Sequence, residues 1–323
     1  MVQVVRIHET GGPEKLTVEE LDPAPPGPGE IQIRQTAIGL NFIDTYQRSG
    51  LYPVELPMVL GMEGAGVVEE LGEGVSDLKP GERVAYPMQM GGYAQVRNVQ
   101  ADRVIRIPDN IDDRTAAAMM LKGMTVEYLL ERCFQVRRAQ TILFHAAAGG
   151  VGLIACQWAK ALGATVIGTV STDAKAALAK AHGCDHTIVT SREDILARVK
   201  DITGGKGVPV VYDSIGRDTF TASMACLAPR GMLVSFGQSS GPVAAFDPAL
   251  LAKGGSLYYT RPSLGNYIAS RADLEQSGRR ATDMVGTGKV RIAVNQTYKL
   301  ADIVQAHRDL EARKTTGSTV LLP

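Results

Sequence analysis

The first hundred residues alternate between short apolar runs and turn-forming residues. Four β-branched runs, VQVVRIHE, LTVEEL, EIQIRQTAIGL and GAGVVEELG, are separated by glycine and proline, and KPGERVAY adds a turn that leads into a further strand. The segment DPAPPGPGE at 22–30 is a turn-rich connector, too short for a disordered linker. This pattern predicts a β-rich first part of the chain.

The pattern changes near residue 110, where the apolar spacing becomes helical. The stretch DDRTAAAMMLKGMTVEYLLERC predicts a helix that starts at Asp112 or Asp113. Up to about residue 260, the apolar runs TILFHAA, TVIGTV, VVYDSIG, MLVSFG and SLYYT alternate with helices expected to start near Val151, Ala174, Glu193 and Asp218. Such alternation predicts parallel strands joined by crossover helices. A long helical stretch after 265, the helical segment IVQAHRDLEARK and a final strand STVLLP complete the chain.

The composition is that of an ordinary globular protein with balanced charge. The 323 residues are 45% apolar and 21% charged, and this length corresponds to about two domains. Lys plus Arg and Asp plus Glu number 34 each, which gives no reason to expect nucleic acid or an anionic membrane as a partner. The chain shows no membrane-spanning apolar run, no signal-peptide pattern and no CxxC pair among its four cysteines. We expect a cytoplasmic protein.

The segment HAAAGGVGLIACQWAKALGA at 145–164 joins an apolar run to a helical pattern through small residues. Ala147, Gly149 and Gly152 have the spacing of a dinucleotide-binding fingerprint, with alanine in the first glycine position. Small residues let the backbone approach a pyrophosphate, to which the helix N-terminus offers N–H groups and a positive dipole end. The alternative is a plain strand–helix turn packed with small residues. The strand–turn–helix context and the second strand that follows favour a bound dinucleotide.

The residues after the second strand of this segment indicate which dinucleotide binds. An NAD site usually has an acid about 20 residues after the glycines, but Val170 stands there, followed by Ser171 and Lys175. An uncharged strand end with a hydroxyl and a lysine nearby favours the 2′-phosphate of NADP. Asp173 keeps the alternative open, because a shift of one or two residues would let it bind the ribose of NAD.

Several segments spread along the chain are specific in combination. They are NFIDTYQRSGLY, KGMTVEYLL, HAAAGGVGLIACQWAKALGA, VVYDSIGRDT, VSFGQSSG and TRPSL. Together they resemble the zinc-free quinone oxidoreductases, relatives of the ζ-crystallins in the medium-chain dehydrogenase/reductase superfamily, and the resemblance covers essentially the whole chain. It implies an α/β protein with a GroES-like β-barrel catalytic domain (1–122 and 262–323) and a Rossmann doubly wound parallel sheet (123–261). It also implies NADPH in the cleft between the domains and a homodimer joined through the Rossmann sheets.

The resemblance also bears on metal binding. Zinc alcohol dehydrogenases of this superfamily carry a cysteine and a histidine where this chain has Asn41 and Met62, neither of which replaces such a ligand. Glu63 is present beside Met62, but one carboxylate is no metal site, and the cysteine-rich structural-zinc lobe is missing. The segment HGCDH at 182–186 is interpreted as a helix end capped by Gly183 and a surface connection. We therefore expect no metal.

The resemblance places site residues one by one. Asn41, Tyr46 and Tyr52 would form the catalytic end, where NADPH passes a hydride to a quinone and Tyr46 is the candidate proton donor. The residues expected to contact the cofactor are Phe42, Thr125, Tyr128, Gly149, Gly150, Val151, Gly152, Ser171, Lys175, Thr190, Phe236, Gly237, Ser239, Arg261 and Arg313. Thr190 departs from the tyrosine that relatives often carry there, so stacking area is lost while a hydroxyl remains.

Simpler interpretations exist for some of these residues. Asn41 could cap a turn, Tyr52 could pack over a loop, Tyr128 could lie in a helix core, and Lys175 and Arg313 could be solvated. Other functions also fit the same fold. A reductase of conjugated C=C bonds in 2-alkenals or enones would share the cofactor and the zinc-free cleft. A non-catalytic NADPH-binding protein, crystallin-like or RNA-binding, is a further class, although the chain has no basic run.

Overall fold

The computed structural model describes residues 1–323 and divides them into two compact units. The first unit holds residues 1–124, 268–287 and 292–323, and the second holds 125–267 and 288–291. The sequence analysis placed the divisions at 122/123 and 261/262. The division after Met124 falls within α2 (Asp113–Glu127), whose start is capped by the carboxylate of Asp112 on the N–H of Thr115.

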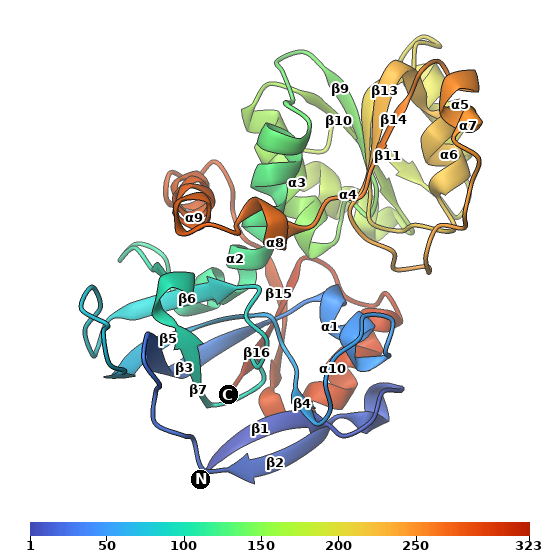
Figure 1. The fold of residues 1–323 in the computed structure, drawn as a ribbon. Coiled ribbons are helices and arrows are strands. Elements are labelled where there is room, and N and C mark those ends of the chain that lie inside the picture. The colour runs from blue at the N-terminus through green and yellow to red at the C-terminus, as the bar shows by residue number, and fades with distance from the viewer. The chain divides into compact units, whose positions relative to one another are not determined.

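The second unit is built on a six-stranded parallel sheet (Figure 1). Its strands are β9 (Thr141–Phe144), β10 (Thr165–Val170), β11 (His186–Val189), β12 (Val208–Asp213), β13 (Leu227–Ser235) and β14 (Tyr258–Thr260). They lie in the order β11-β10-β9-β12-β13-β14, and every pairing is parallel. This is the order of a Rossmann sheet, in which ligands bind at the switch point between the first and fourth strands, here β9 and β12.

Helices alternate with these strands as the pattern predicts, and α8 follows the last strand. They are α3 (Gly150–Ala161), α4 (Asp173–Ala181), α5 (Ile195–Ile202), α6 (Phe220–Ala225), α7 (Ala249–Lys253) and α8 (Leu264–Tyr267), and a π-helix at Tyr128–Cys133 continues α2. Side-chain caps set two of the starts, since Thr172 accepts from the N–H of Lys175 and Asp194 from that of Ala197. The central strands are buried on both faces, which explains their continuous apolar runs.

The first unit combines a seven-stranded sheet with a three-stranded one. The larger sheet runs β15 (Val294–Lys299), β16 (Ser318–Leu322), β3 (Glu30–Leu40), β5 (Glu63–Leu71), β6 (Arg83–Pro87) and β8 (Ile105–Arg106), with β7 (Val96–Gln100) also paired to β3. The smaller sheet runs β2 (Thr17–Leu21), β1 (Val2–Ile7) and β4 (Met58–Val59). Within this unit only β15 and β16 pair in parallel.

The helices of the first unit are α1 (Phe42–Arg48), α9 (Arg271–Gly286) and α10 (Ile303–Glu311), besides the start of α2. Although far apart in sequence, α1 and α10 lie side by side (Figure 1). An apolar cluster that includes Ile7, Leu60 and Ile303 packs beside them. β16 pairs with the end of β3, which leads directly into α1, so the C-terminal segment helps to position that helix. None of the helices has the length and apolar content needed to cross a membrane.

Candidate active site

The glycine-rich turn lies between β9 and α3. Gly149 is the N-cap of α3, and as a glycine it gives the first turn no side-chain cap. A Cβ on Gly152 would lie 2.3 Å from the carbonyl oxygen of Ala146 and 2.7 Å from Cα of Ala147, so this position requires glycine. Ala146 itself has a φ of 53°, which is uncommon for a residue with a side chain. The turn thus offers the close backbone and the helix N-terminus without a side-chain cap that suit a pyrophosphate.

Buried polar groups beneath this turn fix its shape. His145 bonds through Nδ1 to Oγ1 of Thr169 and through Nε2 to Oγ of Ser223, both at 2.9 Å, and burial lowers the pKa of the imidazole. The Ser223 hydroxyl donates to Oδ2 of Asp213 at 2.7 Å, so it accepts from Nε2–H of a neutral His145. Asp213 also accepts from two backbone N–H groups of the turn after β12. The sequence analysis did not single out Asp213, although an acid at the end of a buried strand was visible.

The adenosine end of the predicted site lies after β10 and β11. Ser171 is exposed directly after β10, and Lys175 lies in the first turn of α4. The Thr190 hydroxyl, which we expected to remain for the cofactor, donates instead to the carbonyl oxygen of Val170 at 3.2 Å. Thr190 therefore ties the end of β11 to β10 and has no hydroxyl proton left for a ligand.

The residues predicted at the nicotinamide ribose follow β13 and β14. The N–H of Phe236 donates to the Asp213 carbonyl oxygen at 2.8 Å, and Arg261 Nη1 donates to the Ser235 carbonyl oxygen at 2.9 Å. Gly237 lies against the turn after β12, because its Cβ would come within 2.8 Å of the Ser214 carbonyl oxygen. The carboxyl ends of parallel strands share one edge of a sheet. That edge brings together Gly149, Gly150, Val151, Gly152, Ser171, Lys175, Thr190, Phe236, Gly237, Ser239 and Arg261.

Two predicted cofactor contacts precede β9. Tyr128 is 2% exposed and stacks on Tyr267, with ring centroids 4.4 Å apart. Burial raises the pKa of the Tyr128 phenol. The structure therefore favours the interpretation of Tyr128 as a packed core residue over one against the cofactor. Thr125 lies one turn earlier, at the end of α2, and is also buried.

The predicted catalytic residues lie at α1 in the first unit. Asn41 is the N-cap of α1, and its N–H donates to Oδ2 of Asp44 at 2.9 Å in a capping box. The sequence analysis did not predict this helix, although Asn-x-x-Asp was its signal. The Tyr46 ring contacts those of Phe42 and Tyr52 edge-on, at centroid distances of 5.4 and 5.2 Å. The structure thus groups Asn41, Phe42, Tyr46 and Tyr52.

A buried ion pair orients the Asn41 amide. Glu63 is fully buried at the start of β5, and its Oε2 accepts from Lys122 Nζ and Asn41 Nδ2, each at 2.9 Å. Because a carboxylate only accepts, the amide turns its NH2 toward Glu63 and directs its carbonyl oxygen away. Gly39 allows this approach, since a Cβ there would lie 2.4 Å from Glu63 Oε2. Sequence reasoning gave Lys122 no role, although it is the first residue of the segment KGMTVEYLL.

The positions compared with zinc ligands are engaged otherwise. Asn41 bonds to Glu63, and the thioether of Met62 accepts from a glutamine amide at 3.4 Å. In the HGCDH segment, His182, Cys184 and Asp185 each bond to backbone groups. The structure brings no three His, Cys, Asp or Glu side chains together in a way that could hold a metal ion.

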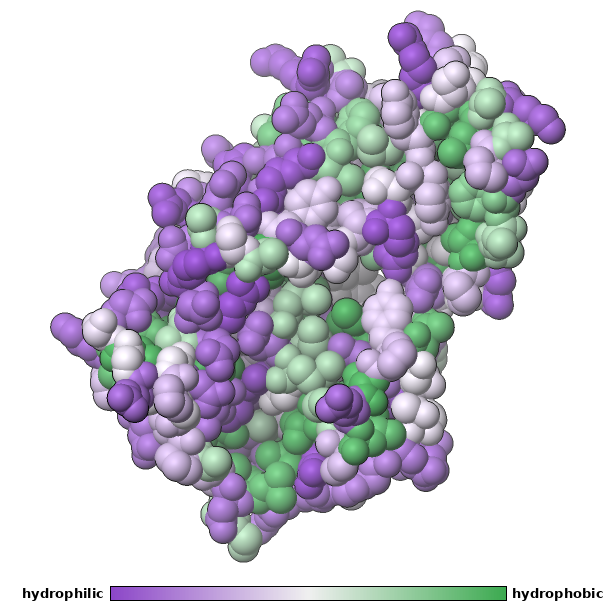
Figure 2. Space-filling view, in the orientation of Figure 1, coloured by the Kyte–Doolittle hydropathy of each residue, from purple (hydrophilic) through white to green (hydrophobic).

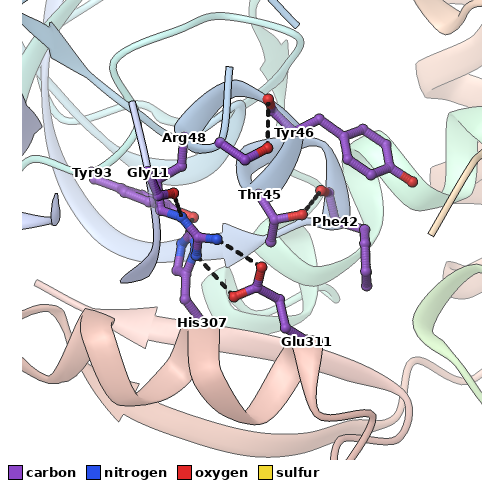
Figure 3. Close-up of polar contacts among 9 residues, drawn as sticks. Gly11, Phe42, Thr45, Tyr46, Arg48, Tyr93, His307 and Glu311 are labelled. Carbon is purple, nitrogen blue, oxygen red and sulfur yellow. Dashed lines mark hydrogen bonds and ion pairs between the residues drawn. The ribbon is translucent and has the colours of Figure 1, made fainter. Parts of the chain in front are cut away.

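The other side of α1 is anchored by the buried guanidinium of Arg48 (Figure 3). It donates to both carboxylate oxygens of Glu311, at 3.0 and 2.7 Å, and to Nδ1 of His307 at 3.0 Å. Since Nδ1 accepts, the neutral ring carries its proton on Nε2 and donates to Tyr93 Oη at 3.0 Å. Tyr93 in turn donates to Asp44 Oδ2 at 2.7 Å. In Figure 3 the Tyr46 ring points away from this cluster.

Arg313, the remaining predicted cofactor contact, is exposed just after α10.

Asp44 and His307, which both bond to Tyr93, have pKa values shifted in opposite directions. Burial raises the pKa of Asp44 to about 7 and lowers that of His307 to about 3. The Asp44 contribution to stability is complete below its unfolded pKa near 4 and is lost as the pH rises toward 7. The His307 contribution is complete above its unfolded pKa near 6.5 and is lost as the pH falls toward 3. Between pH 4 and 6.5 the two effects oppose each other.

Asp44→Asn should remove one of these two opposing effects on the free energy of unfolding. The amide keeps an acceptor for Tyr93 but does not titrate, so the His307 effect stands alone. Between pH 4 and 6.5, the free energy of unfolding of the variant should rise by about 2–3 kcal/mol relative to the wild type. Urea unfolding at several pH values measures this, and His307→Gln should show the opposite slope. Parallel pH profiles for wild type and Asp44→Asn would contradict the assignment.

Comparison with known proteins agrees with this architecture. Two family descriptions match the chain, "Alcohol dehydrogenase GroES-like domain" at residues 27–109 and "Zinc-binding dehydrogenase" at 150–276. The quinone oxidoreductase of Pseudomonas aeruginosa is 50% identical over 325 residues, which cover 100% of both chains. The crystal structure of Escherichia coli quinone oxidoreductase complexed with NADPH has a TM-score of 0.98 at 48% identity and covers 99% of this chain and 100% of that one. The 2-haloacrylate reductase of a Burkholderia species is 45% identical over 333 residues, covering 100% of this chain and 99% of the relative.

The fold and the site define a dehydrogenase/reductase of the medium-chain superfamily, with a GroES-like unit and a Rossmann unit. Within that superfamily, the chain belongs to the quinone oxidoreductase family. The family and fold class expected from the sequence are thereby confirmed. One matching description names zinc, but in this chain Asn41 and Met62 stand where the resemblance puts zinc ligands.

Proposed function

We propose that the protein is an NADPH-dependent oxidoreductase that transfers a hydride to a quinone without a metal ion. The observation that carries the proposal is the turn before α3, where Gly152 has no room for a side chain and the N-cap Gly149 makes no side-chain cap. Relatives named quinone oxidoreductase, one of them solved with NADPH, support the choice of cofactor and acceptor. NADPH, when bound, supplies the hydride.

The residues of the protein bind NADPH and the quinone, orient them and supply a proton to the quinone. The N–H groups of Gly150 and Val151, in the first turn of α3, would hold the pyrophosphate, and Ser171 and Lys175 would hold the 2′-phosphate. Phe236, Gly237, Ser239 and Arg261, which follow β13 and β14, would hold the ribose on the nicotinamide side. Asn41, Phe42, Tyr46 and Tyr52 bind the quinone and the nicotinamide end, with Thr125. Arg313 adds charge for the 2′-phosphate. Reduction of a quinone to a hydroquinone consumes one hydride and one proton, and the Tyr46 phenol is the proposed proton donor.

A second function is favoured by one relative. The 45% identical relative is named 2-haloacrylate reductase, and a 2-haloacrylate contains a conjugated C=C bond. Steady-state NADPH oxidation with 1,4-benzoquinone, 9,10-phenanthrenequinone, 2-alkenals and 2-chloroacrylate separates the two functions. We expect turnover with quinones. Turnover of the C=C compounds without any quinone turnover would replace the first proposal with the second.

Lys175→Ala tests the choice of NADPH. Losing one charge-assisted contact to the 2′-phosphate should raise the Kd for NADPH by roughly tenfold and leave the Kd for NADH within about twofold. Fluorescence titration of the purified protein with each nucleotide measures both values. Equal losses for NADPH and NADH would show that Lys175 does not contact the extra phosphate.

We also propose that the protein is a cytoplasmic homodimer joined through the Rossmann sheets. β14 is an edge strand, and its Tyr258 side chain is 58% exposed. Hydrophobic residues also reach the surface where α6 and α7 lie (Figure 2). A charge on this edge would oppose pairing of two copies, so Tyr258→Asp should raise the dimer Kd by roughly a hundredfold or more. Light scattering after gel filtration should show a wild-type dimer and a variant monomer. A monomeric wild type would contradict the proposal.

A further inference from the structure

A bidentate ion pair joins the segments that follow two neighbouring strands of the Rossmann sheet. Arg192 Nη1 and Nη2 donate to Oδ2 and Oδ1 of Asp173, at 2.8 and 2.7 Å. Asp173 is the first residue of α4, directly beyond β10, and Arg192 follows the neighbouring strand β11. Both residues therefore lie at the carboxyl edge of adjacent parallel strands, where a Rossmann sheet binds the adenosine ribose.

The pair changes the interpretation of Asp173. By position, this acid is the alternative ligand for the ribose hydroxyls, which would favour NADH. Both of its carboxylate oxygens are bonded to Arg192, and these hydrogen bonds lower the pKa of Asp173. A neighbouring acid, Glu193, is engaged elsewhere, with the N–H of Val189 and the guanidinium of Arg198. Asp173 is thus the carboxylate that accepts hydrogen bonds from the Arg192 guanidinium.

Arg192 also has donors to spare. A guanidinium carries five N–H donors, and the bonds to Asp173 use two of them. Its side chain is 54% exposed, so a ligand can reach the remaining donors. Thr190, two residues earlier, offers neither an aromatic face nor a hydroxyl proton. With Lys175 in the first turn of α4, Arg192 gives this edge a second cation.

We infer that the Asp173–Arg192 pair sets the preference for NADPH over NADH. Arg192 holds the Asp173 carboxylate away from the ribose hydroxyls and presents its remaining N–H donors to the 2′-phosphate. A planar guanidinium suits bidentate binding of a phosphate. The inference deepens the proposed function and rests on its NADPH dependence, but it assigns the selectivity to the pairing of Asp173 with Arg192, a residue that no motif marks.

The experiment compares nucleotide affinities of the full-length wild type with those of Arg192→Ala and Asp173→Asn. Arg192→Ala should raise the Kd for NADPH roughly 10- to 100-fold. Its Kd for NADH should stay the same or fall, because Asp173 becomes available to the ribose. Asp173→Asn should leave NADPH binding as tight or tighter and NADH binding unchanged, because Arg192 already keeps this carboxylate from the ribose. Displacement by adenosine 2′,5′-bisphosphate and by 5′-AMP isolates this end of the site, and Arg192→Ala should affect only the first probe strongly.

Arg198→Ala is the matched control, since it removes another exposed arginine that pairs with acids of the same unit. It should not change the ratio of the two Kd values, which excludes a general effect of net charge. Equal weakening of NADPH and NADH by Arg192→Ala, or no weakening of either, would overturn the inference and leave the proposed function intact. A wild-type protein that binds neither nucleotide would overturn both.

Discussion

Lys122→Met is expected to lower the free energy of unfolding by about 3–5 kcal/mol. Lys122 is the counter-ion of Glu63, and their side chains are 7% and 0% exposed. Methionine has a similar length but no charge, so the variant leaves a carboxylate buried without its ion pair. Urea denaturation followed by circular dichroism measures the loss, with the midpoint and the slope fitted separately.

The double variant Lys122→Met/Glu63→Gln separates stability from catalysis. With both charges removed, most of the lost stability should return, because a neutral pair costs little to bury. The amide oxygen of the introduced glutamine can still accept from the N–H of Leu121, which in the wild type donates to Glu63 Oε1 at 2.7 Å. The NH2 of that glutamine then faces Asn41, whose amide must reverse. We expect a kcat at least about tenfold below that of the wild type, with an unchanged Kd for NADPH. A single variant that loses less than about 1 kcal/mol would contradict the assigned importance of the pair.

Gly152→Ala is expected to raise the Kd for NADPH roughly 10- to 100-fold, which corresponds to about 1.4–2.7 kcal/mol. The added Cβ would lie 2.3 Å from the Ala146 carbonyl oxygen, a backbone atom that no side-chain rotation can move away. The first turn of α3 must therefore shift from the turn that follows β9. The same overpacking should cost about 1–3 kcal/mol of stability.

Gly123→Ala is a suitable control for this glycine substitution. Gly123 lies inside α2, and its added Cβ would meet Cβ of Ala281 at 3.3 Å, where a side chain can adjust. Its NADPH affinity should equal that of the wild type. Isothermal titration of both variants, with thermal unfolding on the same samples, distinguishes loss of the nucleotide site from loss of the fold. Tight NADPH binding by Gly152→Ala would show that the phosphates do not approach the backbone here.

Sequence patterns predicted the regular part of this molecule well. Central Rossmann strands such as TILF and TVIGTV are continuous apolar runs because both their faces are buried, and glycines and caps separate them from the helices. The glycine turn is similarly local, since the strand, turn and helix are consecutive. The short helix α1 was missed because its seven residues carry no full apolar repeat, and only the Asn41–Asp44 capping box marks it.

The rest of the site depends on contacts between residues distant in sequence. Lys122 reaches Glu63 only because α2 and β5 meet in the folded unit. Arg192 reaches Asp173 only because β10 and β11 are neighbours in the sheet. For Tyr128 the sequence allowed both a core and a cofactor position, and stacking on Tyr267 from the far end of the unit favours the core. No local spacing encodes such contacts.

The central claim is that the chain binds NADPH and passes its hydride to a quinone without a metal ion. The most direct measurement is a single-turnover reaction of protein treated with a strong chelator, checked for residual metal, loaded with NADPH and mixed with 1,4-benzoquinone. The account predicts that absorbance at 340 nm disappears with one quinone reduced per NADPH, at the same rate with and without chelation. No oxidation by the quinone, or a rate that is lost on chelation and restored by added zinc, would contradict it.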